Sequence, residues 1–245
     1  MIETLSLTGV TKQIGGLTAV NNVDLTIGDG QIVGLVGPNG AGKTTLLNII
    51  SGMTPPTAGK VSFLGEDITG MKADRICRKG IAKTFQIAES FPNLSAAQCV
   101  MIGVMFGNSH APGMREAESE ALDILRVVNF PLEKAGTLTR NLNVVELKRL
   151  QLARALACRP KLLLLDELTT GLNPKESNEA VSLIRTIRDR GTSILIIEHV
   201  MSVIMGVSNR IVVLDHGEKI ADGYPHDVVN NQRVIDTYLG DIDAF

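Results

Sequence analysis

The chain has 245 residues, of which 44% are hydrophobic, and a net charge of −2, which suits one large core or one core with an inserted subdomain. The near-neutral charge argues against a nucleic-acid partner, and the three scattered cysteines have neither metal-ligand spacing nor the pattern of a disulfide framework, so they favour a reducing compartment. No basic and apolar leader follows Met1, and no uncharged apolar run reaches the roughly 18 to 20 residues of a membrane helix, so we expect a soluble chain.

Residues 1–86 are expected to be rich in strands. Apolar residues alternate with polar ones over residues 5–10 and 23–27, and again at Val61 and Phe63, and glycines follow each of the three runs. Alternation of this kind is typical of strands with one buried face. We therefore expect a partly exposed antiparallel sheet in this part of the chain.

A complete phosphate-binding loop lies inside this block. It follows a short apolar run at residues 32–36 and leads into a helix-like stretch at residues 45–50, and this strand–loop–helix context argues against a chance glycine-rich turn. Its N–H groups can surround an anion without interference from Cβ atoms, and the helix N-terminus adds its dipole. The lysine is expected to neutralise the β and γ phosphates, and the following threonine hydroxyl to bind Mg²⁺. The predicted nucleoside triphosphate site is formed by Gly37, Pro38, Asn39, Gly40, Ala41, Gly42, Lys43 and Thr44.

Gln86 follows a strand predicted at residues 81–85. Its side chain is uncharged and long enough to reach Mg²⁺ or a water molecule across the cleft; a polar residue at a hinge is the alternative. Beyond it, residues 87–156 are expected to be mainly helical, because apolar residues recur at helical spacing over residues 116–128 and 146–157.

Two carboxylates stand at the end of a second buried strand. Residues 161–167 contain four successive leucines, as expected of a parallel strand that is covered on both faces. Asp166 is suited to hold the Mg²⁺ shell, and Glu167 to orient or deprotonate the attacking water. Two solvated acids after a strand are the alternative, which the upstream phosphate loop argues against.

A third βα segment ends in a histidine. A helix is expected to begin at Pro174, a favoured first-turn residue, and to end at Gly191. Apolar residues 193–197 then form another strand, which ends in Glu198 and His199. Because ligands of open α/β sheets bind at the carboxyl edge of the strands, His199 can contact a γ-phosphate there; a structural histidine is the alternative.

Taken in order, these motifs resemble those of the ATPase subunits of ABC transporters over essentially the whole chain. The family's phosphate loop matches residues 37–45, and its glutamine loop matches Gln86. Its Mg²⁺ aspartate and catalytic glutamate match Asp166 and Glu167. Its D-loop matches residues 171–174, and its switch histidine matches His199. The phosphate loop defined in this way includes Thr45. Residues 15–20, 80–86, 214–223 and 233–240 further resemble the ATPases of branched-chain amino acid importers.

The resemblance implies an α/β fold with a RecA-like phosphate-loop NTPase core, an N-terminal antiparallel β-subdomain and an inserted α-helical subdomain. The chain would form a single ABC ATPase domain over residues 1–245. Within it, residues 1–86 and 157–223 would form the nucleotide-binding core with the antiparallel sheet, residues 87–156 the helical subdomain, and residues 224–245 a C-terminal helical tail.

ATP and Mg²⁺ are the implied cofactors, and ATP hydrolysis that drives import is the implied activity. Glu167 and His199 would be catalytic, and Thr44, Gln86 and Asp166 would hold the metal. The implied partners are a second ABC ATPase (heterodimer favoured, homodimer possible), two transmembrane permease subunits and, indirectly, an external solute-binding protein. The complex would lie at the bacterial cell membrane with this chain on the cytoplasmic face, without nucleic acid. The solute stays open among branched-chain amino acids, urea, amides and aromatic acids.

The family signature, Leu-Ser-Gly-Gly-Gln, is the motif that departs most. In the family it closes on the γ-phosphate bound by the other subunit, and its glycines permit close backbone approach. Two bulky β-branched residues replace these glycines, Glu146 is expected to add negative charge near an anion, and Asn143 can still donate. Ile14 stands where the family has an aromatic residue that stacks on adenine. The alternative function is therefore a catalytically impaired regulatory or structural subunit of a heterodimer. The aligned residues are Leu142, Asn143, Val144, Val145 and Glu146.

Residues 90–114 contain no Asp, Glu, Lys or Arg. Two interpretations are open for this segment. It is either a buried helix with its loops or an apolar docking face for the coupling helices of membrane subunits.

Overall fold

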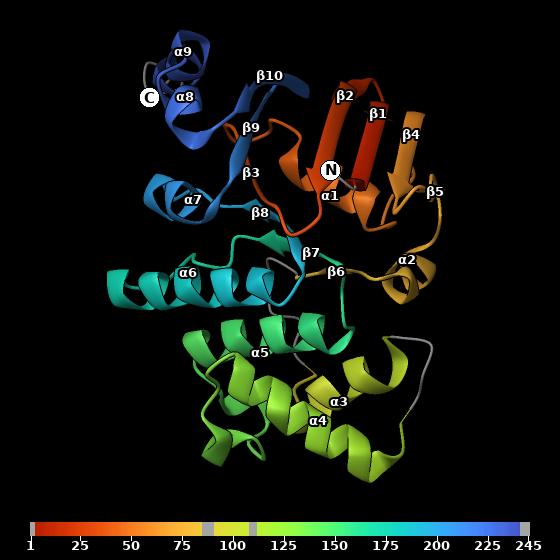
Figure 1. The fold of residues 1–245 in the computed structure, drawn as a ribbon, viewed down its shortest axis with the longest axis vertical. Coiled ribbons are helices and arrows are strands. Elements are labelled where there is room, and N and C mark those ends of the chain that lie inside the picture. Colours follow the sequence, from red (N-terminus) through yellow and green to blue (C-terminus); the bar gives the residue numbers. More distant parts are fainter. Residues whose placement is uncertain (1–2, 85–90, 108–111, 241–245) are drawn as a thin grey trace.

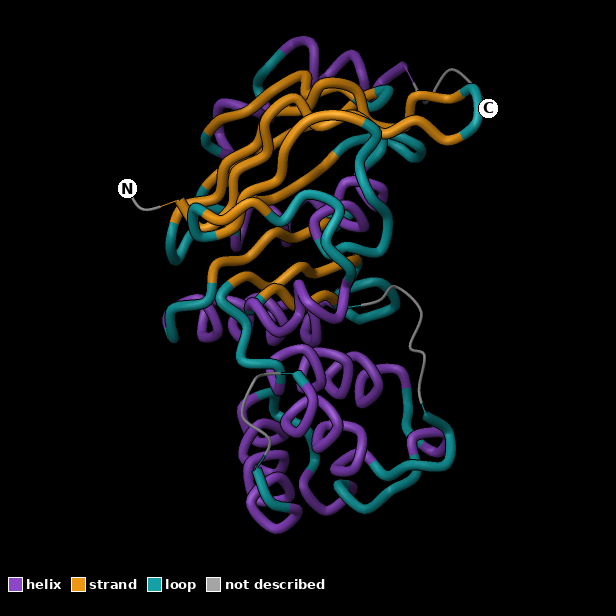
Figure 2. The backbone as a smooth tube through the Cα atoms, turned by 90° about the vertical axis from the view of Figure 1, so that its right-hand side faces the viewer, coloured by secondary structure: helices purple, strands orange, loops and turns teal. Residues whose placement is uncertain are grey.

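Two β-sheets and a separate group of helices make up the computed structural model, which describes residues 3–84, 91–107 and 112–240. The sheets occupy the upper half of the view in Figure 1, and helices α3, α4 and α5 form the lower end. Figure 2 shows the same separation from the side, with all the strands in the upper part and a group of helices alone at the lower end. No helix in the described ranges is long and apolar enough to cross a membrane.

The first sheet is antiparallel and has the strand order β2-β1-β4-β5. Its inward-facing apolar residues are buried while their neighbours are more exposed, which confirms the alternation expected for residues 1–86. Burial of one face against the rest of the molecule fixes the register of the sheet. The strands are β1 (Glu3–Ile14), β2 (Leu17–Gly28), β4 (Ala58–Phe63) and β5 (Glu66–Asp67).

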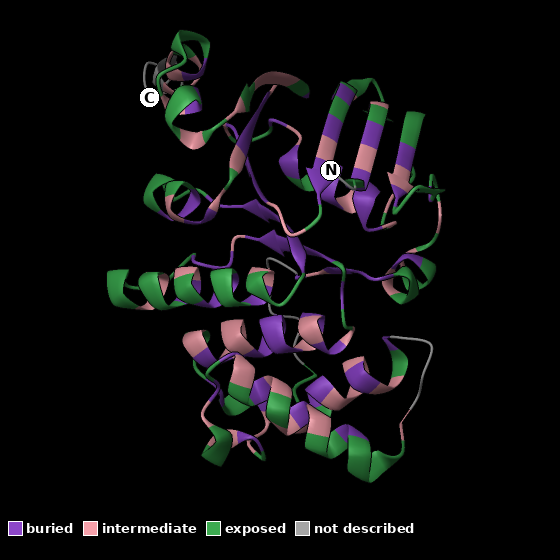
Figure 3. Cartoon of the chain, in the orientation of Figure 1, coloured by how far each residue is buried: buried purple, intermediate pink, exposed green. Residues whose placement is uncertain are grey.

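The second sheet has six strands in the order β10-β9-β3-β8-β7-β6. Its strands pair in parallel from β9 to β6, and β10 adds an antiparallel edge. The central strands β3, β8 and β7 are buried along their whole length (Figure 3). The strands are β3 (Ile32–Val36), β6 (Ile81–Lys83), β7 (Leu162–Asp166), β8 (Ser193–Ile197), β9 (Arg210–Asp215) and β10 (Glu218–Gly223).

Side chains of the parallel sheet alternate between two cores. Along β7, Leu162 and Leu164 join the core shared with the antiparallel sheet and helix α1 (Lys43–Ile50). Leu163 and Leu165 join the core on the other face, under the helices. Covering both faces explains why this strand reads as an unbroken apolar run. The fold therefore matches the predicted α/β class, with a phosphate-loop core, an antiparallel subdomain and a helical insert.

Helical caps fix several element ends. Helix α5 begins two residues before the expected start because Asn143 and Glu146 form a capping box at its N-terminus. Asn173 and Glu176 cap α6 in the same way, ahead of Pro174. The helices are α2 (Ala73–Lys79), α3 (Ala96–Phe106), α4 (Met114–Val127), α5 (Val144–Ala157), α6 (Pro174–Asp189), α7 (Met201–Val207), α8 (Pro225–Val229) and α9 (Gln232–Gly240), with short 3₁₀ turns at Leu132–Lys134 and Thr139–Asn141.

Strand β6 is shorter than predicted, since it ends at Lys83 rather than at residue 85. Thr84 still hydrogen-bonds to the neighbouring strand through its N–H, which donates to the carbonyl oxygen of Leu164 at 2.9 Å. Gln86 lies outside the described residues.

The charge-free segment is neither wholly buried nor wholly exposed. Val100 and Val104 on α3 are buried against α4 and α5, whereas Phe106 at the end of the helix is 67% exposed. Phe91, which precedes the helix, is also exposed. Within the described part of this segment, the buried-helix interpretation therefore holds for one face, and docking of a membrane subunit on the exposed face stays a prediction.

Candidate functional site

The phosphate loop is held by close backbone contacts on two sides. Gly37 has φ +148°, and a Cβ there would lie 2.0 Å from the carbonyl oxygen of Leu214 on β9. Gly42 has φ +95°, and a Cβ there would lie 2.3 Å from the carbonyl oxygen of Ala19 on β2. Only glycine fits at both positions, because both the dihedral angle and the space exclude a side chain. The loop between β3 and α1 is thus packed between a strand of each sheet, β9 on one side and β2 on the other.

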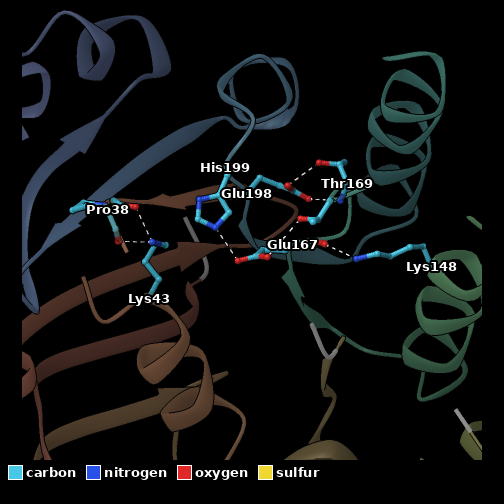
Figure 4. Close-up of polar contacts among 9 residues, drawn as sticks. Pro38, Lys43, Lys148, Glu167, Thr169, Glu198 and His199 are labelled. Carbon is cyan, nitrogen blue, oxygen red and sulfur yellow. Dashed lines mark hydrogen bonds and ion pairs between the residues drawn. The ribbon is translucent and has the colours of Figure 1, made fainter. Parts of the chain in front are cut away.

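Lys43 occupies the inside of this loop. Its Nζ donates hydrogen bonds of 2.7 Å to the carbonyl oxygens of Gly37 and Pro38 (Figure 4). Burial lowers the pKa of Lys43, while the nearby carboxylates of Glu167 and Asp166 act in the opposite direction. A buried ammonium group that donates to carbonyl oxygens of its own loop is ready to exchange them for an anion.

Asp166 ends β7 and is 3% exposed. Its Oδ2 lies 3.5 Å from the Nζ of Lys83, whereas its Oδ1 is buried with no hydrogen-bond partner within the described part of the chain. Burial raises the pKa of Asp166, and the charge of Lys83 counteracts that effect. An orphaned carboxylate oxygen is costly unless it meets a cation, so this residue fits a hard divalent metal ion.

Glu167 and His199 meet across the sheet edge. The Nε2 of His199 lies 2.8 Å from Oε1 of Glu167, and Figure 4 shows the imidazole ring pointing toward the carboxylate. Glu167 has φ +51°, a left-handed conformation that is unusual for this residue type. Its carbonyl oxygen accepts a 2.8 Å hydrogen bond from Lys148 Nζ. Strain of this kind persists where the surroundings fix it, and it clusters at functional sites.

A cavity of about 590 Å³ brings Lys43, Glu167 and His199 together, whereas Asp166, Gly37 and Pro38 do not line it. Its walls come from the phosphate loop, the end of β7 and the end of β8, with two exposed apolar side chains, Ile14 and Leu17, at one side. The predicted residues Thr44 and Thr45 line it together with Lys43, Glu167 and His199. The sheet topology therefore assembles the predicted site from segments that are far apart in sequence.

Glu198 is a buried carboxylate that the sequence analysis named only as a strand end. Its oxygens accept hydrogen bonds of 2.7 Å from both the N–H and the hydroxyl of Thr169. Burial raises the pKa of Glu198, and the hydrogen bonds from Thr169 work against that shift. The contact ties the segment after Glu167 to the end of β8. The available signal was an acid directly after a buried strand, the same signal that identified Asp166.

Glu146 contradicts the sequence-based prediction of a negative charge directed at an anion. Its carboxylate accepts a 3.0 Å hydrogen bond from the N–H of Asn143, and Oε1 lies 2.5 Å from the Nζ of Lys134. Burial disfavours the charged form, but the bonds from Lys134 and Asn143 outweigh it and lower the pKa of Glu146. The charge is turned inward and neutralised, while Asn143 and Val144 at the helix start are exposed.

Comparison with known proteins gives one consistent match. The sequence model of a family described as ABC transporter matches residues 20–170. The high-affinity branched-chain amino acid transport ATP-binding protein of Escherichia coli K12 is 38% identical over 252 residues, covering 97% of this chain and 98% of that protein.

Solved structures agree with the sequence match. The ADP conformation of an ATP-binding cassette of an ABC transporter has a TM-score of 0.89 at 25% identity, covering 98% of this chain and all of that chain. A dimeric post-hydrolysis cassette bound to ADP and Pi has a TM-score of 0.83 at 28% identity, covering 90% of this chain and 98% of that one.

The ion pair between Lys134 and Glu146 can be tested by measuring the free energy of unfolding. Lys134→Ala removes the partner of a buried carboxylate and should lower the free energy of unfolding by about 1 to 2 kcal/mol near pH 7. Because the folded pKa of Glu146 is lowered, this contribution is present above its unfolded pKa and should fade as pH falls through the folded pKa. Denaturant unfolding at several pH values measures both effects.

Lys175→Ala, at an exposed lysine in the first turn of α6, is the matched control and should change stability by less than about 0.5 kcal/mol. Equal losses for the two variants at every pH would show that Glu146 does not depend on Lys134.

Proposed function

The chain belongs to the ABC transporter family, and we propose that it is the ATP-hydrolysing subunit of an importer for a branched-chain amino acid or a similar small polar solute. The cargo assignment is supported by the near full-length similarity to an E. coli protein named for branched-chain amino acid transport. The observation that carries the activity is the single cavity shared by Lys43, Thr44, Glu167 and His199.

We assign nucleotide binding to residues 37–45. The phosphates of ATP would lie on the N–H groups of the loop and on the N-terminus of α1, where the helix dipole favours negative charge. Lys43 would exchange the carbonyl oxygens of Gly37 and Pro38 for the β and γ phosphates. Ile14 and Leu17 at the rim of the cavity offer apolar contact to the adenine, without the stacking that an aromatic residue provides.

Asp166, Thr44 and, from its sequence match, Gln86 are the residues proposed to hold Mg²⁺. The orphaned Oδ1 of Asp166 supports this assignment, because a buried acceptor without a donor suits a hard cation. When bound there, the metal ion would supply positive charge that offsets the negative charge of the phosphates.

Glu167 is proposed to orient the attacking water and to accept its proton. With its proton on Nε2, His199 donates to the Glu167 carboxylate at 2.8 Å and so holds that carboxylate toward the cavity. Lys148 fixes the backbone of Glu167 from the other side. These contacts give the carboxylate one orientation before the substrate arrives, which is how a positioned base accelerates proton transfer.

A second ATPase subunit is proposed to complete each nucleotide site, as in the dimeric cassette with ADP and Pi. Val144 at the start of α5 is 56% exposed, so a nucleotide held by a partner would meet this side chain rather than a glycine backbone. We favour a heterodimer whose other subunit keeps the signature glycines. Comparing the ATPase rate of the native protein with that of a variant that carries glycine at residues 144 and 145 distinguishes this heterodimer from a homodimer or a purely regulatory subunit.

We propose that the complex contains two transmembrane permease subunits and that one of them docks on a groove beside the phosphate-loop core of this chain, which would place the chain at the cytoplasmic face of the membrane. The groove has a volume of about 320 Å³ and lies between α2, β6, α3 and α5. Met53 and Phe106 line it and are 56% and 67% exposed. Exposed apolar side chains around a concave surface are typical of a binding site for a partner helix.

Lys43→Ala should weaken ATP binding roughly tenfold to a hundredfold, because a charge-assisted contact to phosphate contributes about 1.5 to 3 kcal/mol. Titration calorimetry with Mg-ATP measures the affinity, and circular dichroism checks the fold. Lys60→Ala, at an exposed lysine of β4, is the control and should bind ATP normally. Unchanged affinity in a folded Lys43→Ala protein would overturn the assignment of the phosphate loop.

Glu167→Gln should bind ATP but reduce turnover by a factor of about 10² to 10⁴, the usual contribution of a positioned base. The ATP-bound dimer should then accumulate, which light scattering detects with Mg-ATP. Glu133→Gln, at an exposed acid in a 3₁₀ turn, is the control and should keep normal turnover. Near-normal hydrolysis by Glu167→Gln would place the base elsewhere.

The signature can be restored without losing the helix cap. Val144→Gly with Val145→Gly leaves Asn143 and Glu146 in place, at a cost of up to about 1 kcal/mol for each glycine. If the valines obstruct the partner's nucleotide, the double variant should hydrolyse ATP faster than the native homodimer, measured in steady state at matched dimer fraction. Native activity equal to that of the variant would remove the case for a heterodimer.

A further inference from the structure

All three cysteines of the chain line one groove, although they are far apart in sequence. Cys77 lies on α2, Cys99 on α3, and Cys158 at the C-cap of α5. Cys99 is buried, whereas Cys77 and Cys158 are both partly exposed. The thiols that a small reagent can reach in the groove are therefore those of Cys77 and Cys158.

Cys77 and Cys158 lie on either side of the same residue, Gly107. The Sγ of Cys77 is 3.9 Å from the carbonyl oxygen of Gly107, and a Cβ added to Gly107 would lie 2.5 Å from the Sγ of Cys158. A side chain at residue 107 would therefore collide with the Cys158 thiol, and the glycine leaves the space between the two cysteines free.

The two thiols differ in character. The hydrogen bond from Cys158 lowers the pKa of Cys77 to about 7 against the effect of burial, with help from the charge of Arg78. The same hydrogen bond and burial raise the pKa of Cys158. Burial also raises the pKa of Cys99. At neutral pH Cys77 is therefore partly deprotonated while Cys158 remains protonated, the arrangement of an attacking and a resolving cysteine.

We propose that Cys77 and Cys158 are a redox pair that hydrogen peroxide oxidises to an intramolecular disulfide across this groove. The Cys77 thiolate attacks one peroxide oxygen and breaks the O–O bond, which leaves a sulfenic acid and a hydroxide that takes up a proton to become water. Cys158 then loses its proton as its sulfur attacks the Cys77 sulfur, and the S–O bond breaks to release a second water. The two sulfurs lose two electrons and the peroxide gains them; a dithiol reductant reverses the change.

The bond would tie α2 to the end of α5. On the proposed function, this is the groove where a permease helix docks, so oxidation would restrict docking and link transport to peroxide exposure. Regulatory disulfides of this kind are exceptions to the reduced state of most cytosolic thiols. The disulfide itself does not depend on docking, and its test uses the isolated chain.

The experiment is peroxide treatment of the full chain at pH 7, followed by intact mass and peptide mapping. The native protein and Cys99→Ser should lose two hydrogens and yield a linked Cys77–Cys158 peptide, which dithiothreitol reverses. Cys158→Ser should stop at a sulfenic acid on Cys77, trapped by dimedone. Given the pKa difference and the lower nucleophilicity of a more acidic thiol, Cys77 should react roughly fivefold or more faster than Cys99.

Cys77→Ser should form no intramolecular disulfide and provides the matched control, since it retains the other two thiols. A linkage to Cys99, a disulfide only between molecules, or no disulfide after peroxide treatment would each overturn the proposal. Loss of ATP binding or of permease docking in other experiments would leave this result unaffected, so the two proposals fail separately.

Discussion

The site depends on the close packing of backbone around the phosphate loop. Carbonyl oxygens from β9 and β2 approach Gly37 and Gly42 so closely that no other residue fits at either position. Since β9 belongs to one sheet and β2 to the other, the same contacts that shape the loop also join the two sheets. These contacts fix the backbone of the loop at the start of α1, where a helix N-terminus attracts an anion.

Three acids lie at the carboxyl ends of β7 and β8, and their surroundings separate them chemically. Asp166 has one oxygen without a hydrogen-bond partner among the described residues, Glu167 contacts His199, and Glu198 accepts hydrogen bonds from Thr169. Lys83 adds a physical link, since it lines the groove beside α2 and also lies 3.5 Å from Asp166. A partner that fills the groove would therefore touch a residue that is one contact away from the proposed metal ligand.

Much of this could be predicted from the sequence because the signals are local. The strand, glycine loop and helix around Lys43 occur as one continuous segment, and the leucines of β7 show that both faces of this strand are covered. The remaining features depend on contacts between residues that are far apart in the sequence, so they could not be predicted from it. The charge of Glu146 is neutralised by Lys134, which only the folded chain brings near, and the cysteines meet in a groove that no sequence spacing indicates. The hydrogen bonds between Thr169 and Glu198 could not be predicted, because the two residues lie on different segments of the chain.

The most direct measurement is a structure of the Glu167→Gln protein with Mg-ATP. We predict the phosphates on the N–H groups of residues 40–45, with the Lys43 Nζ moved from the carbonyl oxygens of Gly37 and Pro38 to the phosphates. The metal ion should lie within ligand distance of Thr44 and of Asp166 Oδ1. Phosphates bound outside the loop, or a metal ion that leaves Oδ1 of Asp166 without a partner, would contradict this account of the site.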